Sequence, residues 1–135
     1  MKLNIIIPNY NGRHFLSACL HSLTKQSFTD FDITVVDNGS SDDSLRWLSE
    51  HYPYVHTIPL CKNTGFSSAV NMGILRTKSP YVMVLNNDTL LTSDCISQLM
   101  RAIQKSPQIF SAGANILTLS SPHLTDTTGD FYSIQ

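Results

Sequence analysis

Four short segments of the chain are rich in carboxylate, carboxamide and hydroxyl groups, and each follows an apolar run. They are Asn9-Tyr10-Asn11-Gly12, Asp37-Asn38-Gly39-Ser40, Lys62-Asn63-Thr64-Gly65 and Asn86-Asn87-Asp88-Thr89. Such groups can hydrogen-bond a polar ligand or supply oxygen ligands to a hard cation. Two of the segments contain a carboxylate, and the different neighbours of the two carboxylates suggest two different tasks.

The first carboxylate, Asp37, suits a partner that presents an N–H or O–H group. An ionised carboxylate only accepts hydrogen bonds. Uracil, thymine and guanine carry ring N–H groups, whereas adenine and cytosine offer only an exocyclic amine, so Asp37 weakly favours the first three bases. The same segment is equally typical of a turn in which Asp37 accepts backbone N–H groups ahead of a helix.

The second carboxylate, Asp88, is the better metal ligand. Mg²⁺ and Mn²⁺ prefer oxygen, and they commonly combine one or two protein carboxylates with phosphate oxygens. The residues around Asp88 could equally form a polar turn before a helix. Asn63, Thr64 and Gly65 are also typical of a helix entry, whose N–H groups meet an anion or water. The joint placement of the four segments favours a binding site.

The apolar runs that precede these segments alternate with stretches of helical period, which predicts parallel strands joined by helical crossovers. We predict strands at residues 3–8, 33–37, 55–59, 81–85 and 109–114. The predicted fold is α/β, a three-layer sandwich with a mostly parallel sheet. In such a sheet the carboxyl ends of all strands lie at one edge, and ligands bind outside that edge.

Four apolar stripes predict the helices between the strands. Their residues are Phe15, Leu16, Cys19, Leu20 and Leu23; Leu45, Leu48 and Tyr52; Phe66, Ala69, Val70, Gly73 and Ile74; and Ile96, Leu99, Met100 and Ile103. We interpret these stripes as faces that pack in the core.

Composition limits the organisation and the partners of the chain. Its 135 residues, 41% of them hydrophobic, predict a single domain with one core. Nine basic and ten acidic residues are scattered along the chain and give a net charge of -1, which argues against nucleic acid as a partner. The longest apolar runs are too short for a transmembrane segment, and no signal peptide is visible. We therefore expect a cytoplasmic location, and we expect the three cysteines to be reduced.

Three other classes of protein share this alternation of strands and helices. A nucleotidyltransferase would place a Gly-rich, basic loop after the first strand, where this chain has one glycine and one arginine. A dinucleotide-binding domain needs G-x-G-x-x-G there, and this motif is absent. A receiver-like regulatory domain needs an acidic pair after the first strand, where this chain has Pro8-Asn9. The nucleotidyltransferase and the receiver-like domain are kept as alternatives.

Four motifs in a fixed order carry a resemblance to a known family. They are Ile6-Ile7-Pro8-Asn9-Tyr10-Asn11-Gly12, Val35-Val36-Asp37-Asn38-Gly39-Ser40-Ser41-Asp42, Asn63-Thr64-Gly65-Phe66 with Ala69, Asn71 and Gly73, and Val84-Leu85-Asn86-Asn87-Asp88-Thr89. The chain resembles family 2 of the glycosyltransferases, particularly the rhamnosyltransferase-like branch. This resemblance implies the GT-A fold, a Rossmann-like fold of nucleotide-diphospho-sugar transferases.

The resemblance also implies roles for individual residues. Asp37 would contact the nucleotide base, Asp88 would bind a divalent metal, Mn²⁺ or Mg²⁺, and Asn86 takes the place of the first Asp in the family's Asp-x-Asp motif. An amide at that position supplies no negative charge. Pro8, Asn9 and Tyr10 would form a wall beside the base, and Asn63 and Gly65 would close over it. The expected nucleotide-sugar site comprises Pro8, Asn9, Tyr10, Asn11, Asp37, Asn38, Gly39, Ser40, Asn63, Gly65, Asn86 and Asn87.

The reaction implied by the resemblance is transfer of a sugar from a UDP-, dTDP- or GDP-linked donor, with inversion, to an acceptor hydroxyl. The acceptor would be a glycan or a lipid-linked acceptor in surface polysaccharide assembly. The family's general base matches no residue here and is expected beyond residue 135. We therefore expect residues 1–135 to form a single nucleotide-sugar-binding domain, truncated before the acceptor region and inactive alone. For the full-length protein, the inner face of the membrane is a second expected location.

Overall fold

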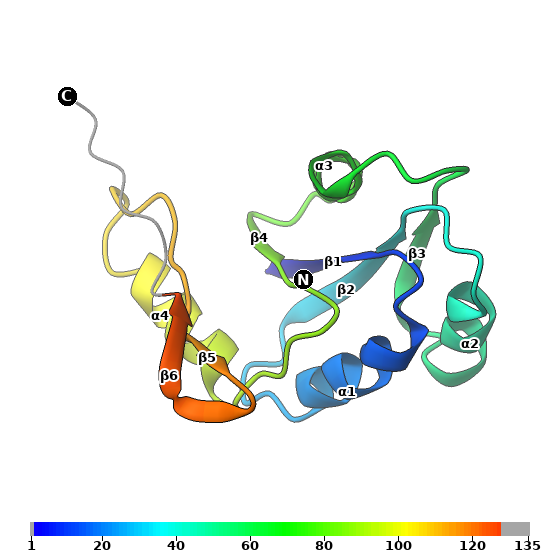
Figure 1. Cartoon of the computed structure of the whole chain (residues 1–135). Coiled ribbons are helices and arrows are strands. Elements are labelled where there is room, and N and C mark those ends of the chain that lie inside the picture. Colours follow the sequence, from blue (N-terminus) through cyan, green and yellow to red (C-terminus); the bar gives the residue numbers. More distant parts are fainter. Residues whose placement is uncertain (1, 128–135) are drawn as a thin grey trace.

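The computed structural model describes residues 2–127 of the chain, and within them strands and helices alternate along the sequence (Figure 1). The elements in chain order are β1 (Leu3–Asn9), α1 (Arg13–Thr24), β2 (Phe31–Asp37), α2 (Ser44–His51), β3 (His56–Pro59), α3 (Phe66–Arg76), β4 (Tyr81–Val84), α4 (Cys95–Ile103), β5 (Ile116–Thr118) and β6 (Ser121–Thr127). The first four predicted strands and all four predicted helices are confirmed.

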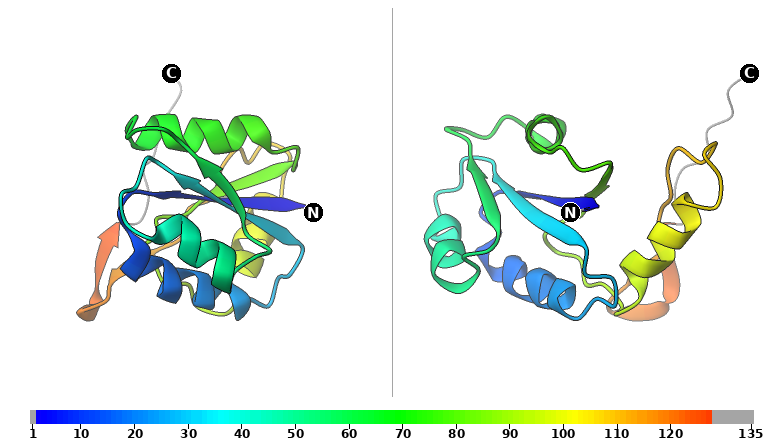
Figure 2. Two further views of the ribbon diagram at one scale, coloured as in Figure 1. Left: turned by 90° about the vertical axis from the view of Figure 1, so that its right-hand side faces the viewer. Right: turned by 180° about the vertical axis from the view of Figure 1, so that it is seen from behind.

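Strands β1 to β4 form one parallel sheet in the order β3-β2-β1-β4. Helices α1 and α2 cover one face of the sheet and α3 covers the other (Figure 2). The central strand β1 contains three successive isoleucines, Ile5 to Ile7, and all three are fully buried because the strand is enclosed on both faces. The predicted three-layer α/β sandwich is therefore confirmed.

The pleat of β1 divides the buried side chains between two cores. Ile5 and Ile7 belong to the larger cluster beneath α1 and α2, whereas Ile6 belongs to the smaller cluster beneath α3. Helix α3 lies very close to the sheet at Gly73. A β-carbon at Gly73 would come within 2.6 Å of Ile6 Cγ2, so the absence of a side chain allows this close packing.

The predicted strand at residues 109–114 is wrong. These residues have no regular structure, and most of them are exposed. The Ile109 N–H bonds to the Ser106 carbonyl in a turn instead of pairing with an edge of the sheet. An apolar run forms a strand only where a neighbouring strand accepts its backbone hydrogen bonds. The chain continues into the antiparallel hairpin of β5 and β6, which was not predicted.

Helix α4 and the hairpin lie to one side of the three layers (Figures 1 and 2). Ile96 and Met100 join α4 to the larger core cluster. The buried side chain of Gln26, just after α1, donates to the Thr92 carbonyl at 2.7 Å and accepts the Ile96 N–H at 3.1 Å. Gln26 therefore anchors the start of α4 to the end of α1.

Candidate functional site

The four polar segments meet at the carboxyl edge of the parallel sheet, as predicted. Asn9 ends β1 and Asp37 ends β2, and these two residues are partners in the register of the two strands. The Asn38 N–H bonds to the Asn9 carbonyl at 2.7 Å, and the Leu60 N–H bonds to the Asp37 carbonyl at 2.8 Å. The loops after β1, β2 and β3 are thus joined through their backbones.

Asp37 organises the turn that follows β2. Its carboxylate is only 1% exposed, and Oδ1 accepts hydrogen bonds from Asn9 Nδ2 at 3.0 Å and from Ser40 Oγ at 2.6 Å. Oδ2 accepts the Ser40 N–H at 3.0 Å. The turn chemistry considered from the sequence is therefore present. A carboxylate offers about four acceptor positions, so Oδ2 keeps one for a further N–H group.

Asn9 lies between Asp37 and the segment that follows β4. It is 1% exposed, and its Nδ2 group also lies 3.1 Å from Ser44 Oγ and 3.4 Å from Ser40 Oγ. Its Oδ1 accepts a hydrogen bond from Asn87 Nδ2 at 2.8 Å. Asn9 is therefore an internal residue of the site, whereas Tyr10 beside it is half exposed.

Asn11 ties the loop after β1 to the loop after β2. Its backbone has a positive φ of 50°, a conformation that asparagine tolerates better than most residues. Its N–H donates to Ser40 Oγ at 2.9 Å, and its Oδ1 accepts the N–H groups of Ser41 at 2.8 Å and of Asp42 at 3.3 Å. The side-chain oxygen of Asn11 is therefore committed to the protein.

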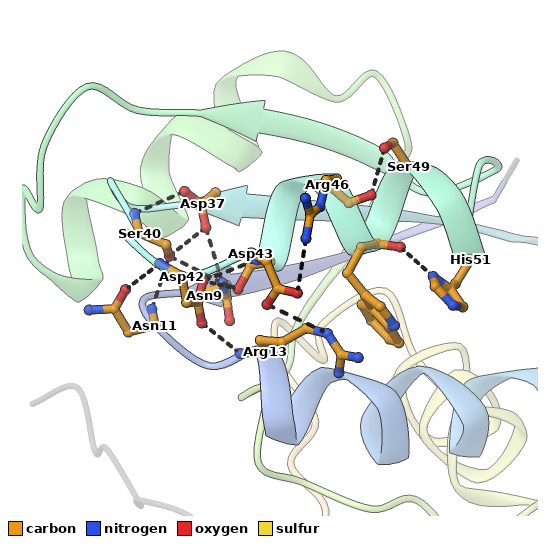
Figure 3. A network of polar contacts seen from close by, with 12 residues as sticks. Asn9, Asn11, Arg13, Asp37, Ser40, Asp42, Asp43, Arg46, Ser49 and His51 are labelled. Atoms are coloured by element: carbon orange, nitrogen blue, oxygen red, sulfur yellow. Dashed lines mark hydrogen bonds and ion pairs between the residues drawn. The ribbon is translucent and has the colours of Figure 1, made fainter.

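A network beneath these loops connects the starts of α1 and α2 (Figure 3). Asp42 accepts the Arg13 N–H at 3.1 Å and the Ser44 N–H at 3.1 Å, and the Ser44 hydroxyl also donates to it. The Arg13 guanidinium lies 3.8 Å from the centre of the Trp47 ring and 4.0 Å from an Asp43 oxygen. Burial works against ionisation of Asp42, but the hydrogen bonds from Ser44 and Arg13 outweigh it and hold its pKa below the usual range.

The roles of Asp42 and Ser44 were not predicted from the sequence. Ser44 is fully buried and links Asn9 to Asp42. The available signal was the run of hydroxyl and carboxylate residues from Ser40 to Ser44 at a helix start. This run shows that hydrogen bonds form locally, but it does not show that Asn9, 35 residues away, takes part.

Asn38 fixes the loop that precedes α3. Its Nδ2 donates to Asn63 Oδ1 at 3.0 Å and to the Gly65 carbonyl at 3.2 Å, and its Oδ1 accepts the Thr64 N–H at 2.9 Å. Gly39 has a φ of +77°, and a β-carbon there would lie 2.6 Å from the Lys62 backbone. The loops after β2 and β3 therefore fit against one another only because residue 39 has no side chain.

The segment after β4 faces solvent on either side of Asn87. Asn86 and Asp88 are exposed, whereas Asn87 is half-buried. The Asn86 carbonyl accepts a hydrogen bond from the buried Cys19 thiol at 3.7 Å. Burial, together with the negative charge of Asp88, raises the pKa of Cys19 to about 12. This thiol is therefore an inert part of the core beneath the Asp88 loop.

The carboxyl edge is an open surface: Tyr10, Asn11, Asn63, Asn86 and Asp88 are exposed there, and Pro8 is partly covered. Two open hollows lie elsewhere. One, of about 520 Å³, lies under the end of α3, and the other, of about 630 Å³, lies beside α4. Neither contains a residue of the four polar segments.

A family model described as Glycosyl transferase family 2 matches residues 4–123, which is most of the chain. The chain belongs to glycosyl transferase family 2. This membership decides against the nucleotidyltransferase and the receiver-like alternatives. It leaves open the branch of the family, including the rhamnosyltransferase-like branch that the motifs resemble.

Two curated relatives illustrate the range of this glycosyltransferase family. The chondroitin synthase of Escherichia coli is 34% identical over 106 residues, covering 76% of this chain and 15% of the relative. The teichoic acid poly(glycerol phosphate) polymerase of Staphylococcus epidermidis is 28% identical over 129 residues, covering 93% of this chain and 18% of the relative. The chain therefore spans less than a fifth of either relative.

Solved structures of glycosyltransferases share the fold. S. aureus TarS 1-349 in complex with UDP-GlcNAc superimposes with a TM-score of 0.71 and 24% identity, over 78% of this chain and 32% of that one. The mannosyltransferase PcManGT from Pyrobaculum calidifontis, in complex with GDP-Man and Mn²⁺, gives a TM-score of 0.69 and 19% identity, over 78% and 33% of the two chains. The predicted GT-A fold is therefore confirmed.

The family's divalent metal can be tested against the residues that this glycosyltransferase chain offers. Among residues 2–127, no three His, Cys, Asp or Glu side chains gather at a distance that could hold a metal ion. Asp88 offers one exposed carboxylate and Asn86 one exposed amide oxygen. This set fits a hard cation that takes its remaining ligands from a diphosphate and water, and it does not fit an ion held by protein alone.

A helix that spans a membrane must be long and continuously apolar. Within residues 2–127, none of the helices combines the length and the apolar character that a membrane-spanning helix requires.

Proposed function

We propose that this chain forms the donor-binding part of an inverting glycosyltransferase that uses a UDP-, dTDP- or GDP-linked hexose or deoxyhexose. The observation that carries the proposal is the placement of two carboxylates on either side of β1. Asp37 ends β2, Asp88 follows β4, and β1 lies between these strands in the sheet. Strands β2 and β4 lie two strand spacings apart, about 10 Å, and the end of β1 lies between them.

In this arrangement the base lies near Asp37 and the diphosphate near Asp88. The free acceptor position on Asp37 Oδ2 receives a ring N–H of uracil, thymine or guanine. The half-exposed ring of Tyr10 offers an apolar surface at the same edge. The loop that contains Asn63 and Gly65, held by Asn38, borders the base on its other side.

The proposed reaction is one displacement, in which an acceptor hydroxyl attacks the sugar carbon as the diphosphate departs, so that the configuration inverts. Asp88, with the Asn86 amide oxygen, would hold Mn²⁺ or Mg²⁺ on the departing diphosphate. When bound, such an ion offsets the negative charge that grows on the leaving group. We assign no general base within the chain, and we expect residues 1–135 alone to bind donor without transferring sugar.

The acceptor proposal rests on the relatives. They include a chondroitin synthase and a teichoic acid poly(glycerol phosphate) polymerase, which by their names make polymers. We therefore propose a glycan or lipid-linked acceptor in polysaccharide assembly. The cytoplasm, or the inner face of the membrane for the full-length protein, stays a prediction.

Thermal unfolding with UDP, dTDP, GDP and ADP, each with and without Mn²⁺, tests the proposal. A ligand at about 100 times its Kd stabilises the folded state by about 2.7 kcal/mol, which raises the melting temperature by several degrees. We expect a Mn²⁺-dependent rise with at least one of the first three nucleotides. The rise should be absent in Asp88→Ala and present in Asp30→Ala, which removes an exposed carboxylate at the other edge of the sheet.

The absence of any shift with a folded protein would contradict donor binding by this chain. A shift of equal size with ADP would contradict the role of Asp37 in selecting the base.

A further inference from the structure

We infer that Asn9 and Asn87 are positioning residues, and that the side-chain groups through which they bond to one another do not contact the donor. They couple the turn at residues 37–40, the base-binding turn, to the loop at residues 86–89, the cation-binding loop. The inference rests on the proposed function and deepens it. It changes the roles expected from the sequence, which placed Asn9 in the wall beside the base and Asn87 among the residues that bind the donor. The basis is a chain of hydrogen bonds from Asp37 through Asn9 to Asn87.

The donor and acceptor directions in this series of hydrogen bonds are fixed by Asp37, at its buried end. The Asp37 carboxylate only accepts, so Asn9 must present its Nδ2 group to Asp37 Oδ1, 3.0 Å away. A flipped Asn9 amide would place two acceptor oxygens against one another in a buried position. Since Asn9 Nδ2 faces Asp37, Asn9 Oδ1 must face the loop after β4.

The loop meets this oxygen with a donor. Asn87 Nδ2 lies 2.8 Å from Asn9 Oδ1, and a carboxylate at position 87 would instead present an acceptor. Gly12 leaves the space for this contact, because a β-carbon at Gly12 would lie 2.6 Å from Asn9 Oδ1 and would clash with Asn87 Nδ2. The backbone φ of Gly12 is -106°, so an alanine there would meet these two amides without a backbone strain of its own.

The inward position of Asn87 sets the outward position of its neighbours. Asn86 and Asp88 are exposed on either side of the half-buried Asn87. The bond to Asn9 therefore holds the loop in a position where Asp88 faces solvent at the same edge as Asp37. Loss of this bond would free the cation-binding loop from the base-binding turn while leaving Asp37 and Asp88 themselves unchanged.

The test compares Asn87→Asp and Asn87→Ala with the unmodified chain at pH 8, by measuring UDP affinity with and without Mn²⁺. A residue that contacted the cation directly would bind it more tightly as Asp, because the carboxylate adds a negative charge. A positioning residue loses its donor in both variants. We expect the Mn²⁺-dependent gain in UDP affinity to fall roughly fivefold to tenfold in both, the effect of one lost hydrogen bond with a buried partner left unpaired.

Affinity for UDP without Mn²⁺ should change less than twofold in both variants, because the bonds to Asp37 remain. Gly12→Ala should reproduce the loss by steric means, and Asn115→Ala, at an exposed asparagine in the segment after α4, should behave like the unmodified chain. A Mn²⁺-dependent gain that is equal or larger in Asn87→Asp than in the unmodified chain would overturn the inference.

A ligand-free measurement separates this inference from the proposed function. The Thr89 N–H bonds to the Asn86 carbonyl at 3.3 Å inside the loop. We expect its hydrogen exchange to accelerate roughly tenfold in Asn87→Ala and in Gly12→Ala, and not in Asn115→Ala. If UDP does not bind the unmodified chain but exchange accelerates, the proposed function fails and the coupling of the loops stands. Unchanged exchange in both variants would refute the coupling.

Discussion

Replacing Asp37 with asparagine tests whether the carboxylate is the internal organiser of the carboxyl edge. An amide in place of the carboxylate has one donor end. If that end replaces Oδ1, it faces Asn9 Nδ2, and if it replaces Oδ2, it faces the Ser40 N–H. Either orientation leaves two donors facing one another in a buried or half-buried position. A buried polar group left unpaired costs about 1–3 kcal/mol. We expect this cost to exceed the free energy that is saved by burying a neutral amide instead of a charge.

The assay is thermal or urea unfolding of Asp37→Asn beside Asp30→Asn. We expect Asp37→Asn to lower the free energy of unfolding by about 1–3 kcal/mol and the melting temperature by roughly 3–12 °C. Asp30 is exposed, so Asp30→Asn makes the same charge change and should remain within ~0.5 kcal/mol of the unmodified chain. If Asp37→Asn also unfolds within ~0.5 kcal/mol of the unmodified chain, the carboxylate does not organise the turn and the reasoning is refuted.

Three further predictions concern the loops and the thiols. Both Gly39→Ala and Gly65→Ala place alanine at a positive φ, and each should lower the free energy of unfolding by about 1–3 kcal/mol. Of the two, Gly39→Ala should cost more, because the new β-carbon meets backbone atoms there and meets nothing within 4 Å at residue 65. Equal costs would contradict this. At pH 8, iodoacetamide should label the exposed Cys61 in the folded chain. Cys19 should react only after unfolding, because it is buried and its pKa is raised to about 12. Peptide mass mapping measures both labelling rates, and equal rates would contradict the burial of Cys19. Folding lowers the pKa of Asp42, so the stabilising contribution of this carboxylate is complete above its unfolded-state pKa of about 4 and is lost as the pH falls from there through the lower folded-state pKa. Asp42→Asn should therefore flatten the decline in the free energy of unfolding below about pH 4. An unchanged acid profile would contradict this.

The sequence predicted those parts of the fold that depend on local periodicity and burial. The run from Ile5 to Ile7 is apolar at successive positions, and the sheet does enclose it on both faces. The alternation of strands and helices then required parallel crossovers, which brought the polar segments to one edge. The strand predicted at residues 109–114 failed because periodicity cannot show whether an edge is available for pairing.

The candidate site was predicted in its residues more than in its contacts. Asp37, Asn38 and Asn87 were all placed at the carboxyl edge from their positions after strands. The sequence could not show that Asp37 and Asn9 are both 99% buried, because that follows from the strand register and from hydrogen bonds between distant loops. It also could not show that Gly12 makes room for the contact between Asn9 and Asn87.

The most direct test of the donor site is a nuclear magnetic resonance titration of the ¹⁵N-labelled chain with UDP, followed by trace Mn²⁺. We predict that UDP shifts the amide signals of residues 9–12, 38–40 and 63–65, and that Mn²⁺ broadens the signals of residues 86–89 first, since a paramagnetic ion acts on its nearest neighbours. Shifts that centre on the hollow under α3, at Lys78 and Ser79, or Mn²⁺ broadening that starts away from Asp88, would contradict a donor site at the carboxyl edge of the sheet.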